Sequence, residues 1–227
     1  ELREDEDHVL DKQAYLRARL FDMLIGDWDR HQDQWRWAEF KENGKKVYRP
    51  VPRDRDQAFS IMDDGFLMST ATWLVPPIRL ISSYEVELKD PKWVNVNPYP
   101  LDVALLSEVP KEDWLEQAEF IQMNITEEVI DRAFLNFPRE VRDYTTDSIK
   151  QTLLGRKALL RDIAEDYFEI VNKYVTITGT DKDDYFQIDR SKDGATTVSV
   201  YRILKGKKEK LFKQRTYNPK AVSYTHL

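Results

Sequence analysis

The sequence predicts an α+β fold: a mostly helical lobe that contains a β-hairpin, followed by a small antiparallel β module. Apolar residues recur at helical spacing near the N-terminus and again over residues 111–174, whereas the period becomes two after Tyr174, as is typical of strands. An Asn-Gly pair at residues 43–44 separates two strand-like runs, which indicates a hairpin. We expect three segments, at residues 1–173, 174–220 and 221–227.

The first elements are a helix and the hairpin. Residues 10–25 carry apolar side chains at helical spacing, and Gly26 ends the run, as a glycine after the last apolar position usually does. The first strand of the hairpin begins at Trp35 and the second covers residues 47–51. The apolar positions that predict the helix are Ala14, Ala18, Phe21 and Ile25.

Prolines interrupt residues 60–110 and disfavour long helices there, because proline lacks an amide donor and restricts the residue before it. Short helical turns are expected near residues 77–84 and 101–106. Three tryptophans are expected in core or groove packing: Trp73, Trp93 and Trp114.

Helices follow from residue 111. Pro110 precedes a helix whose first turn holds Glu112 and Asp113, where negative charge suits the helix dipole. Thr126 has the pattern of an N-cap, and Pro138 starts another short helix. A long last helix is predicted by an apolar stripe over Ile149, Leu153, Leu160, Ala164, Tyr167, Val171 and Tyr174.

A four-stranded meander is predicted next, with strands over residues 175–178, 185–188, 197–201 and 211–215 and turns at 179–184, 191–194 and 205–208. The last seven residues, AVSYTHL, resemble the translated end of a transposon adaptor used in sequencing libraries. We therefore expect this tail to be foreign to the natural protein.

Two acidic loops flank the hairpin: DWDRHQDQ at residues 27–34 and RDRD at 53–56. Paired strands lie about 5 Å apart, so the residues before the first strand and after the second must be neighbours. Carboxylates this close repel unless a cation or arginines lie among them, and Mg2+ or Mn2+ prefers such oxygen ligands. The pattern predicts a metal or phosphate site. The alternative is a salt-bridged structural network of Asp22, Asp27, Asp29 and Asp33 with Arg17, Arg19 and Arg30.

Both loops resemble the catalytic segments of atypical kinases. The matching runs are LIGDWDRHQDQW at residues 24–35 and PRDRDQAF at 52–59. The resemblance is closest to the spore-coat protein H (CotH) kinases, with secretory-pathway and HipA-type kinases more distant. It implies that the lobe is the C-terminal lobe of a kinase-like fold and that the nucleotide-gripping lobe precedes Glu1.

By position, the resemblance makes Asp29 the catalytic aspartate. Gln34 falls where these kinases have a metal-binding asparagine, and Asp54 or Asp56 falls at their metal-binding aspartate. The implied cofactors are Mg2+ or Mn2+ and, only with the missing lobe, ATP. Four residues are assigned to phosphate binding or support: Arg30, His31, Arg53 and Arg55.

Three functions are compatible with these residues. The first is metal-dependent phosphoryl transfer, active or degenerate, to a protein or small-molecule acceptor. The second is a non-catalytic scaffold or pseudokinase, which the glutamine at position 34 favours. A metal-dependent phosphohydrolase is the third and weakest, because such sites recruit several histidines and only His8 and His31 precede the tail.

The order of segments is similar to that of large bacterial envelope proteins in which a calcineurin-like metallophosphoesterase domain and an outer-membrane β-barrel flank the middle. The resemblance implies a soluble fragment in the periplasm or at the outer membrane, with membrane association through other domains. A net charge of -6 argues against a general nucleic-acid-binding surface, and the absence of cysteine excludes disulfides and thiolate chemistry.

Overall fold

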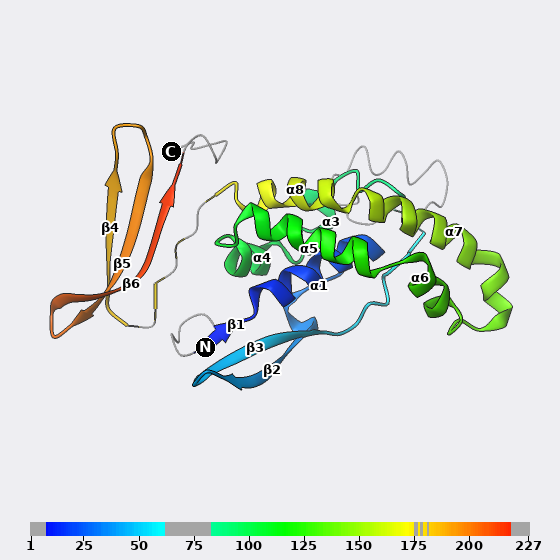
Figure 1. The fold of residues 1–227 in the computed structure, drawn as a ribbon, viewed down its shortest axis with the longest axis horizontal. Coiled ribbons are helices and arrows are strands. Elements are labelled where there is room, and N and C mark those ends of the chain that lie inside the picture. The colour runs from blue at the N-terminus through cyan, green and yellow to red at the C-terminus, as the bar shows by residue number, and fades with distance from the viewer. Residues whose placement is uncertain (1–7, 62–82, 175–176, 178, 181, 219–227) are drawn as a thin grey trace. The chain divides into compact units, whose positions relative to one another are not determined.

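The computed structural model describes residues 8–61, 83–174, 177, 179–180 and 182–218 (Figure 1). Its helices and two small sheets confirm the α+β class. The chain forms two compact units. One consists of Asp11–Ala38 and Arg49–Val171, and the other of the described parts of residues 1–10, 39–48 and 172–227.

Helix α1, Lys12–Ile25, begins at Asp11, whose carboxylate accepts a hydrogen bond from the Ala14 amide at 2.9 Å. It ends as predicted at Gly26, in the left-handed conformation with φ 73°. The predicted apolar stripe is wrong in detail. Of its four positions only Ile25 is buried, and the other three line a shallow groove against α5. The buried face instead consists of Tyr15, Leu16, Arg19, Leu20, Asp22, Met23, Leu24 and Ile25.

The hairpin consists of β2, Trp35–Glu42, and β3, Lys45–Pro52. Asn43 and Gly44 both have positive φ, 52° and 77°, which confirms the predicted tight turn of the type that matches strand twist. A strand that the sequence analysis did not predict, β1 at His8–Leu10, pairs in parallel with β3. The sheet order is therefore β1-β3-β2.

The helices after residue 83 agree with most of the predictions. The helix after Pro110 and the cap at Thr126 are confirmed: Thr126 Oγ1 accepts from the Val129 amide at 3.3 Å. The turns expected near residues 77–84 and the position of Trp73 lie mostly or wholly outside the described residues. The helices are α3 Pro91–Val94, α4 Tyr99–Leu106, α5 Lys111–Asn124, α6 Glu127–Phe134, α7 Arg139–Ala158 and α8 Leu160–Val171.

The expected single last helix is wrong, because it breaks at Leu159 into α7 and α8. The short helix expected after Pro138 is thus the start of α7. Gly155, a poor helix former, precedes the break, and a Cβ there would lie 2.9 Å from Val86. Next to it, Arg156 donates to the carbonyls of Met23, Glu85 and Glu87. These contacts hold the end of α7 against the end of α1 and residues 85–87. The apolar period in the sequence continues from α7 into α8, although the helix itself breaks between them.

The core of the helical unit lies between α1, α5 and α8, which pack against one another (Figure 1). Trp114 of α5 is fully buried and meets the Tyr167 and Phe168 rings at 6.0 and 5.9 Å. At the other side of α1, the Tyr15 ring lies 4.8 Å from the Trp35 ring of β2. Aromatic packing therefore ties α8 to α5, and the hairpin to α1.

The β module is the antiparallel sheet β4-β5-β6, with strands Asp184–Arg190, Thr196–Leu204 and Lys207–Tyr217. These confirm the last three predicted strands. Most of the first, residues 175–178, lies outside the described residues, as does the tail 221–227. The last turn is shorter than predicted, because Lys205 and Gly206 complete it with φ of 51° and 74°.

We predict that Gly26→Ala destabilises the helical unit more than Gly44→Ala does. Both glycines have positive φ, so both substitutions cost about 1 kcal/mol of backbone strain. At Gly26 the new Cβ would also lie 2.7 Å from Tyr84 Cδ2, and the Tyr84 hydroxyl is fixed by donating to the Leu24 carbonyl at 2.9 Å. At Gly44 nothing lies within 4 Å.

The extra loss at Gly26 should be about 2 kcal/mol in free energy of unfolding, measured by urea denaturation. Equal losses of unfolding free energy for the two variants would show that the Tyr84 ring does not pack against Gly26.

Candidate functional site

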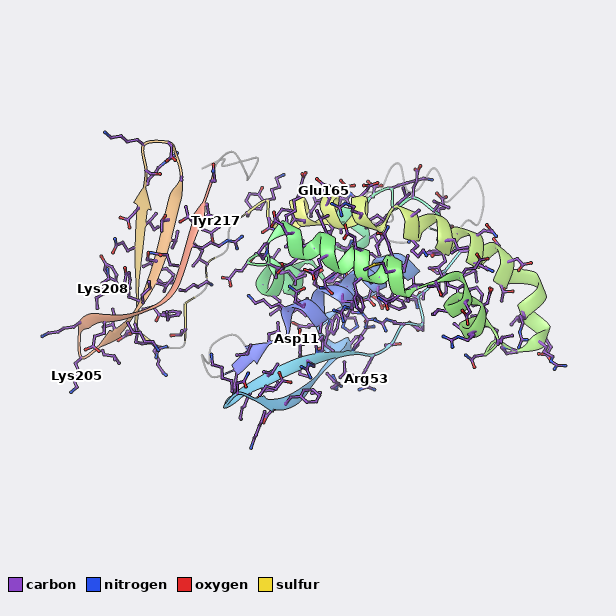
Figure 2. The ribbon with its side chains drawn as sticks, viewed as in Figure 1. Asp11, Arg53, Glu165, Lys205, Lys208 and Tyr217 are labelled. Atoms are coloured by element: carbon purple, nitrogen blue, oxygen red, sulfur yellow. The ribbon has the colours of Figure 1, made fainter. Side chains whose placement is uncertain are left out.

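The two acidic segments meet, as the hairpin geometry predicts. The Arg53 amide donates to the Gln34 carbonyl at 2.9 Å, and the Phe59 amide donates to the Ile25 carbonyl at 3.0 Å. The loop before β2 and the loop after β3 therefore form one paired structure at the base of the hairpin. Figure 2 labels Arg53 at this end of β3.

Arg30 lies at the centre of the paired loops and is fully buried. Its Nη1 donates to Gln34 Oε1 at 3.3 Å and to the Arg53 carbonyl. Its Nη2 donates to Asp27 Oδ2 at 2.6 Å and to Asp22 Oδ1 at 3.3 Å, and its Nε to Asp22 Oδ2 at 2.9 Å. All five N–H groups of the guanidinium are thus engaged, and one side chain connects α1 with both loops.

Asp22, on α1, is the anion on which the arginines converge. Its side chain has no exposed area, and it accepts from Arg30, from Arg19 Nη1 at 2.9 Å and from Arg55 Nε at 2.9 Å. Arg55 comes from the loop after β3, and Arg30 from the loop before β2. A single carboxylate therefore holds both loops against the helix.

The network continues through Arg19 into the helical core. Arg19 Nε donates to both oxygens of Asp102 on α4, at 3.1 and 3.0 Å, and Nη2 donates to Asn95 Oδ1 at 2.6 Å. Asp102 also accepts from the hydroxyls of Tyr15 and Tyr167, each at 2.7 Å. Buried hydrogen bonds thus connect α1, α4 and α8 with the paired loops.

Burial and mutual charge set the protonation of the network. Burial and the charge of Asp102 raise the pKa of Tyr15 and Tyr167, so both hydroxyls keep their protons and donate. Burial alone would lower the pKa of Arg19, but Asp102 and Asp22 outweigh it and raise this pKa. Burial and then Asp22 raise the pKa of Asp27 to about 6, although Arg30 opposes the shift.

The other predicted site residues lie nearer the surface. Asp29 is half-buried and accepts from Asn97 Nδ2 at 3.2 Å. Arg53, Asp54 and Asp56 are exposed, and Asp54 has φ 58°, a left-handed backbone that aspartate tolerates better than most residues. His31 Nδ1 lies 3.8 Å from an oxygen of Asp33.

Gln34, predicted as a metal ligand, is buried, and its amide oxygen already accepts two hydrogen bonds. The donors are Arg30 Nη1 and the His31 amide, at 3.3 and 3.4 Å. An amide oxygen has two lone pairs, so a metal bond to Gln34 requires the loss of at least one of these contacts. Gln34 in this geometry supports the loop before β2.

Mg2+ or Mn2+ needs several oxygen ligands around one point. Asp29, Asp54 and Asp56 supply the hard oxygen donors that these ions prefer. Within the described ranges, however, no group of three or more histidine, aspartate or glutamate side chains is placed to hold a metal. The carboxylates fit such an ion by chemistry, and the buried Gln34 does not fit it without rearrangement.

The salt-bridge interpretation is confirmed for four of the residues that it named, Asp22, Asp27, Arg19 and Arg30. The remaining three lie outside this network: Asp29, Asp33 and Arg17. Three contributing residues were not predicted from the sequence: Asp102, Asn95 and Asn97. They come from a proline-rich segment about seventy to eighty residues away. For Asp102 the sequence did contain a signal: it is the one carboxylate in the otherwise apolar helical run YPLDVALL.

Comparisons of the chain with protein-family models, with curated proteins and with solved structures gave no match.

We predict that Asp22→Asn lowers the free energy of unfolding by about 3–5 kcal/mol, because it leaves the buried guanidiniums of Arg19 and Arg30 without their shared anion. Asp33→Asn is the matched control: it lies in the adjacent loop and its side chain is 82% exposed, so it should change stability by less than about 0.5 kcal/mol. Urea denaturation measures both. A loss below about 1 kcal/mol for Asp22→Asn would contradict the network.

We predict a pH-dependent stability difference between the wild type and Asp27→Asn. Asp27 binds its proton up to pH about 6 when folded and only to about 3.9 when unfolded. The proton therefore favours the folded state, and this contribution is complete below pH 4 and lost as the pH rises through 6. The stability of the wild type relative to Asp27→Asn should fall by about 2 kcal/mol from pH 4 to 7. A flat or rising difference would contradict this.

Proposed function

We propose that the paired loops at residues 27–34 and 53–59 form a metal-dependent phosphoryl-transfer site of the atypical kinase type. The observation that carries the proposal is the junction between them: the Arg53 amide bonds to the Gln34 carbonyl, and Arg30 bonds to the Arg53 carbonyl. This junction brings the segments with Asp29 and Asp54 together, which the proposed chemistry requires. Catalysis of this kind consists of positioning and charge neutralisation.

In this proposal Asp29 orients or deprotonates the acceptor hydroxyl. Asp54, with Asp56 in support, holds Mg2+ or Mn2+, which would neutralise phosphate charge. Arg53 and Arg55 pair with phosphate oxygens. His31 has a positioning role.

Arg30 and Gln34 are assigned support rather than ligand contact. Every N–H group of the Arg30 guanidinium already has an acceptor in the loops or on α1. Their part is to hold the backbone on which the exposed carboxylates stand.

The second candidate is a non-catalytic kinase-like scaffold that binds a nucleotide or a partner. The engagement of Gln34 Oε1 by Arg30 favours it, because the position that resembles a metal-binding asparagine is occupied by a structural contact. A scaffold would keep the paired loops, and any nucleotide that it binds would not need the metal. The two candidates therefore differ in a measurable property.

On the order of segments alone, we further propose that the chain is part of a bacterial envelope protein, in the periplasm or at the outer membrane, between a metallophosphoesterase domain and an outer-membrane barrel. Within the described residues, no helix is both long and apolar enough to cross a bilayer.

Titration of Mn-ATP by calorimetry tests the proposal, on the 227-residue chain and on the protein expressed with whatever coding sequence precedes Glu1. We predict saturable binding by the longer form that needs the metal and weakens at least tenfold in Asp54→Asn, because a carboxylate is exchanged for a weaker neutral ligand. Asp33→Asn should bind as the wild type does. If Asp54→Asn still binds Mn-ATP as the wild type does, Asp54 is not a metal ligand. If no folded form of the protein binds Mn-ATP, the phosphoryl-transfer proposal is wrong and the scaffold is the better account.

A further inference from the structure

The β module has a charge opposite to that of the whole chain. Residues 182–218 contain ten lysines and arginines and five acidic residues, whereas the chain as a whole has a net charge of -6. The excess is concentrated in the β5–β6 hairpin. Between residues 201 and 215 there are seven basic residues and one acidic residue, Glu209.

Three lysines of the hairpin end have exposed ammonium groups. Lys205 lies in the turn, and Lys207 and Lys210 follow on β6. All three are exposed, and within the described part of the chain their ammonium groups make no hydrogen bond or ion pair. Figure 2 labels Lys205 and Lys208 at this end of the hairpin. Three cations are thus held close together, one in the turn and two near the start of β6.

Two exposed leucines flank the lysines. Leu204 precedes the turn and is 46% exposed, and Leu211 follows the lysines and is 42% exposed. Lys208 is held within the sheet: its ammonium lies 3.5 Å from the centre of the Tyr201 ring and donates to Gln187 Oε1 at 2.6 Å. The hairpin end therefore presents apolar side chains beside unpaired cations, with Leu204 opposite Lys207 at the turn and Leu211 opposite Tyr201, farther from it.

We infer that the end of the β5–β6 hairpin, Leu204 to Leu211, binds the surface of a lipid bilayer that contains anionic phospholipids. Lysines near such a surface are attracted by the headgroup phosphates, and their long apolar stems tolerate the interface. Leucines beside them gain by entering the boundary between headgroups and acyl chains. Neither feature belongs to the paired loops, so this inference is independent of the proposed phosphoryl transfer.

Nucleic acid is the other polyanion that such a cluster would attract. Single-stranded binding would need bases to stack on free aromatic faces along an extended basic groove. Here Lys208 lies over the rings of both Tyr201 and Tyr185, at 3.5 and 5.1 Å, and the exposed apolar side chains on either side of the lysines in sequence are leucines. Outside residues 182–218 the chain is strongly acidic, which opposes a long anionic polymer more than contact with a surface at one hairpin end.

Flotation with lipid vesicles tests the inference on the 227-residue chain. One vesicle set contains phosphatidylglycerol with phosphatidylcholine and the other phosphatidylcholine alone. We expect binding to the anionic vesicles only, with weakening from 50 to 500 mM salt, about the range over which exposed charges become screened. Equal binding to both sets, or none to the anionic set, would overturn the inference whatever the variants do.

Matched variants locate the surface. Lys205→Gln, Lys207→Gln and Lys210→Gln together should weaken vesicle binding by about a hundredfold, at about fivefold for each lysine. The control neutralises three exposed lysines elsewhere, Lys41→Gln, Lys45→Gln and Lys192→Gln, which changes the net charge equally and should leave binding within about twofold. Equal weakening in both triple variants would show a general charge effect and overturn the assignment to the hairpin.

The double variant Leu204→Ser and Leu211→Ser tests the apolar contribution. It should weaken vesicle binding and keep its salt dependence. Unchanged affinity would show that the leucines do not contact the bilayer. Circular dichroism checks that each variant keeps its strands. A single-stranded oligonucleotide of matched charge serves as the competitor: tighter binding to it than to anionic vesicles would overturn the lipid assignment.

Discussion

The fold of the helical unit depends on one buried carboxylate, that of Asp22 on α1. Asp22 is fully buried and receives three guanidinium groups, and taking such charges out of water is tolerable only when they are paired. The charges balance: Asp22, Asp27 and Asp102 face Arg19, Arg30 and Arg55. Loss of any one would leave an unpaired charge, which makes the network a cooperative unit.

This network gives the paired loops a fixed base. The loops contain polar residues that would be solvated and mobile by themselves. The hairpin register, the arginines and the backbone hydrogen bonds of Arg53 and Phe59 hold them together. Their exposed members, Arg53, Asp54 and Asp56, therefore stand on a backbone positioned by buried contacts. Either proposed function, catalytic or scaffold, would therefore depend on buried residues such as Asp22 and Arg30, which position the loops without contacting a ligand themselves.

Local features were predictable from the sequence because local physics sets them. Asn43-Gly44 forms its turn, Gly26 ends its helix and Thr126 caps one, each through the conformation or side chain of that residue. The convergence of the two acidic loops followed from strand pairing. The partners of Asp102, the parallel strand β1 and the break at Leu159 were not predictable, since each depends on contacts with distant segments. The same applies to the hydrogen bond that Gln34 Oε1 accepts from Arg30.

Amide hydrogen exchange in wild type and Asp22→Asn tests the central claim most directly. If Asp22 holds both loops, the amides of Arg53 and Phe59, which donate across the junction and to α1, should lose protection together in the variant. The Ile163 amide, bonded to the Leu159 carbonyl at the start of α8, should keep its protection while the unit remains folded. Unchanged protection of Arg53 and Phe59 would contradict the claim, because the loops would then be held by the hairpin alone.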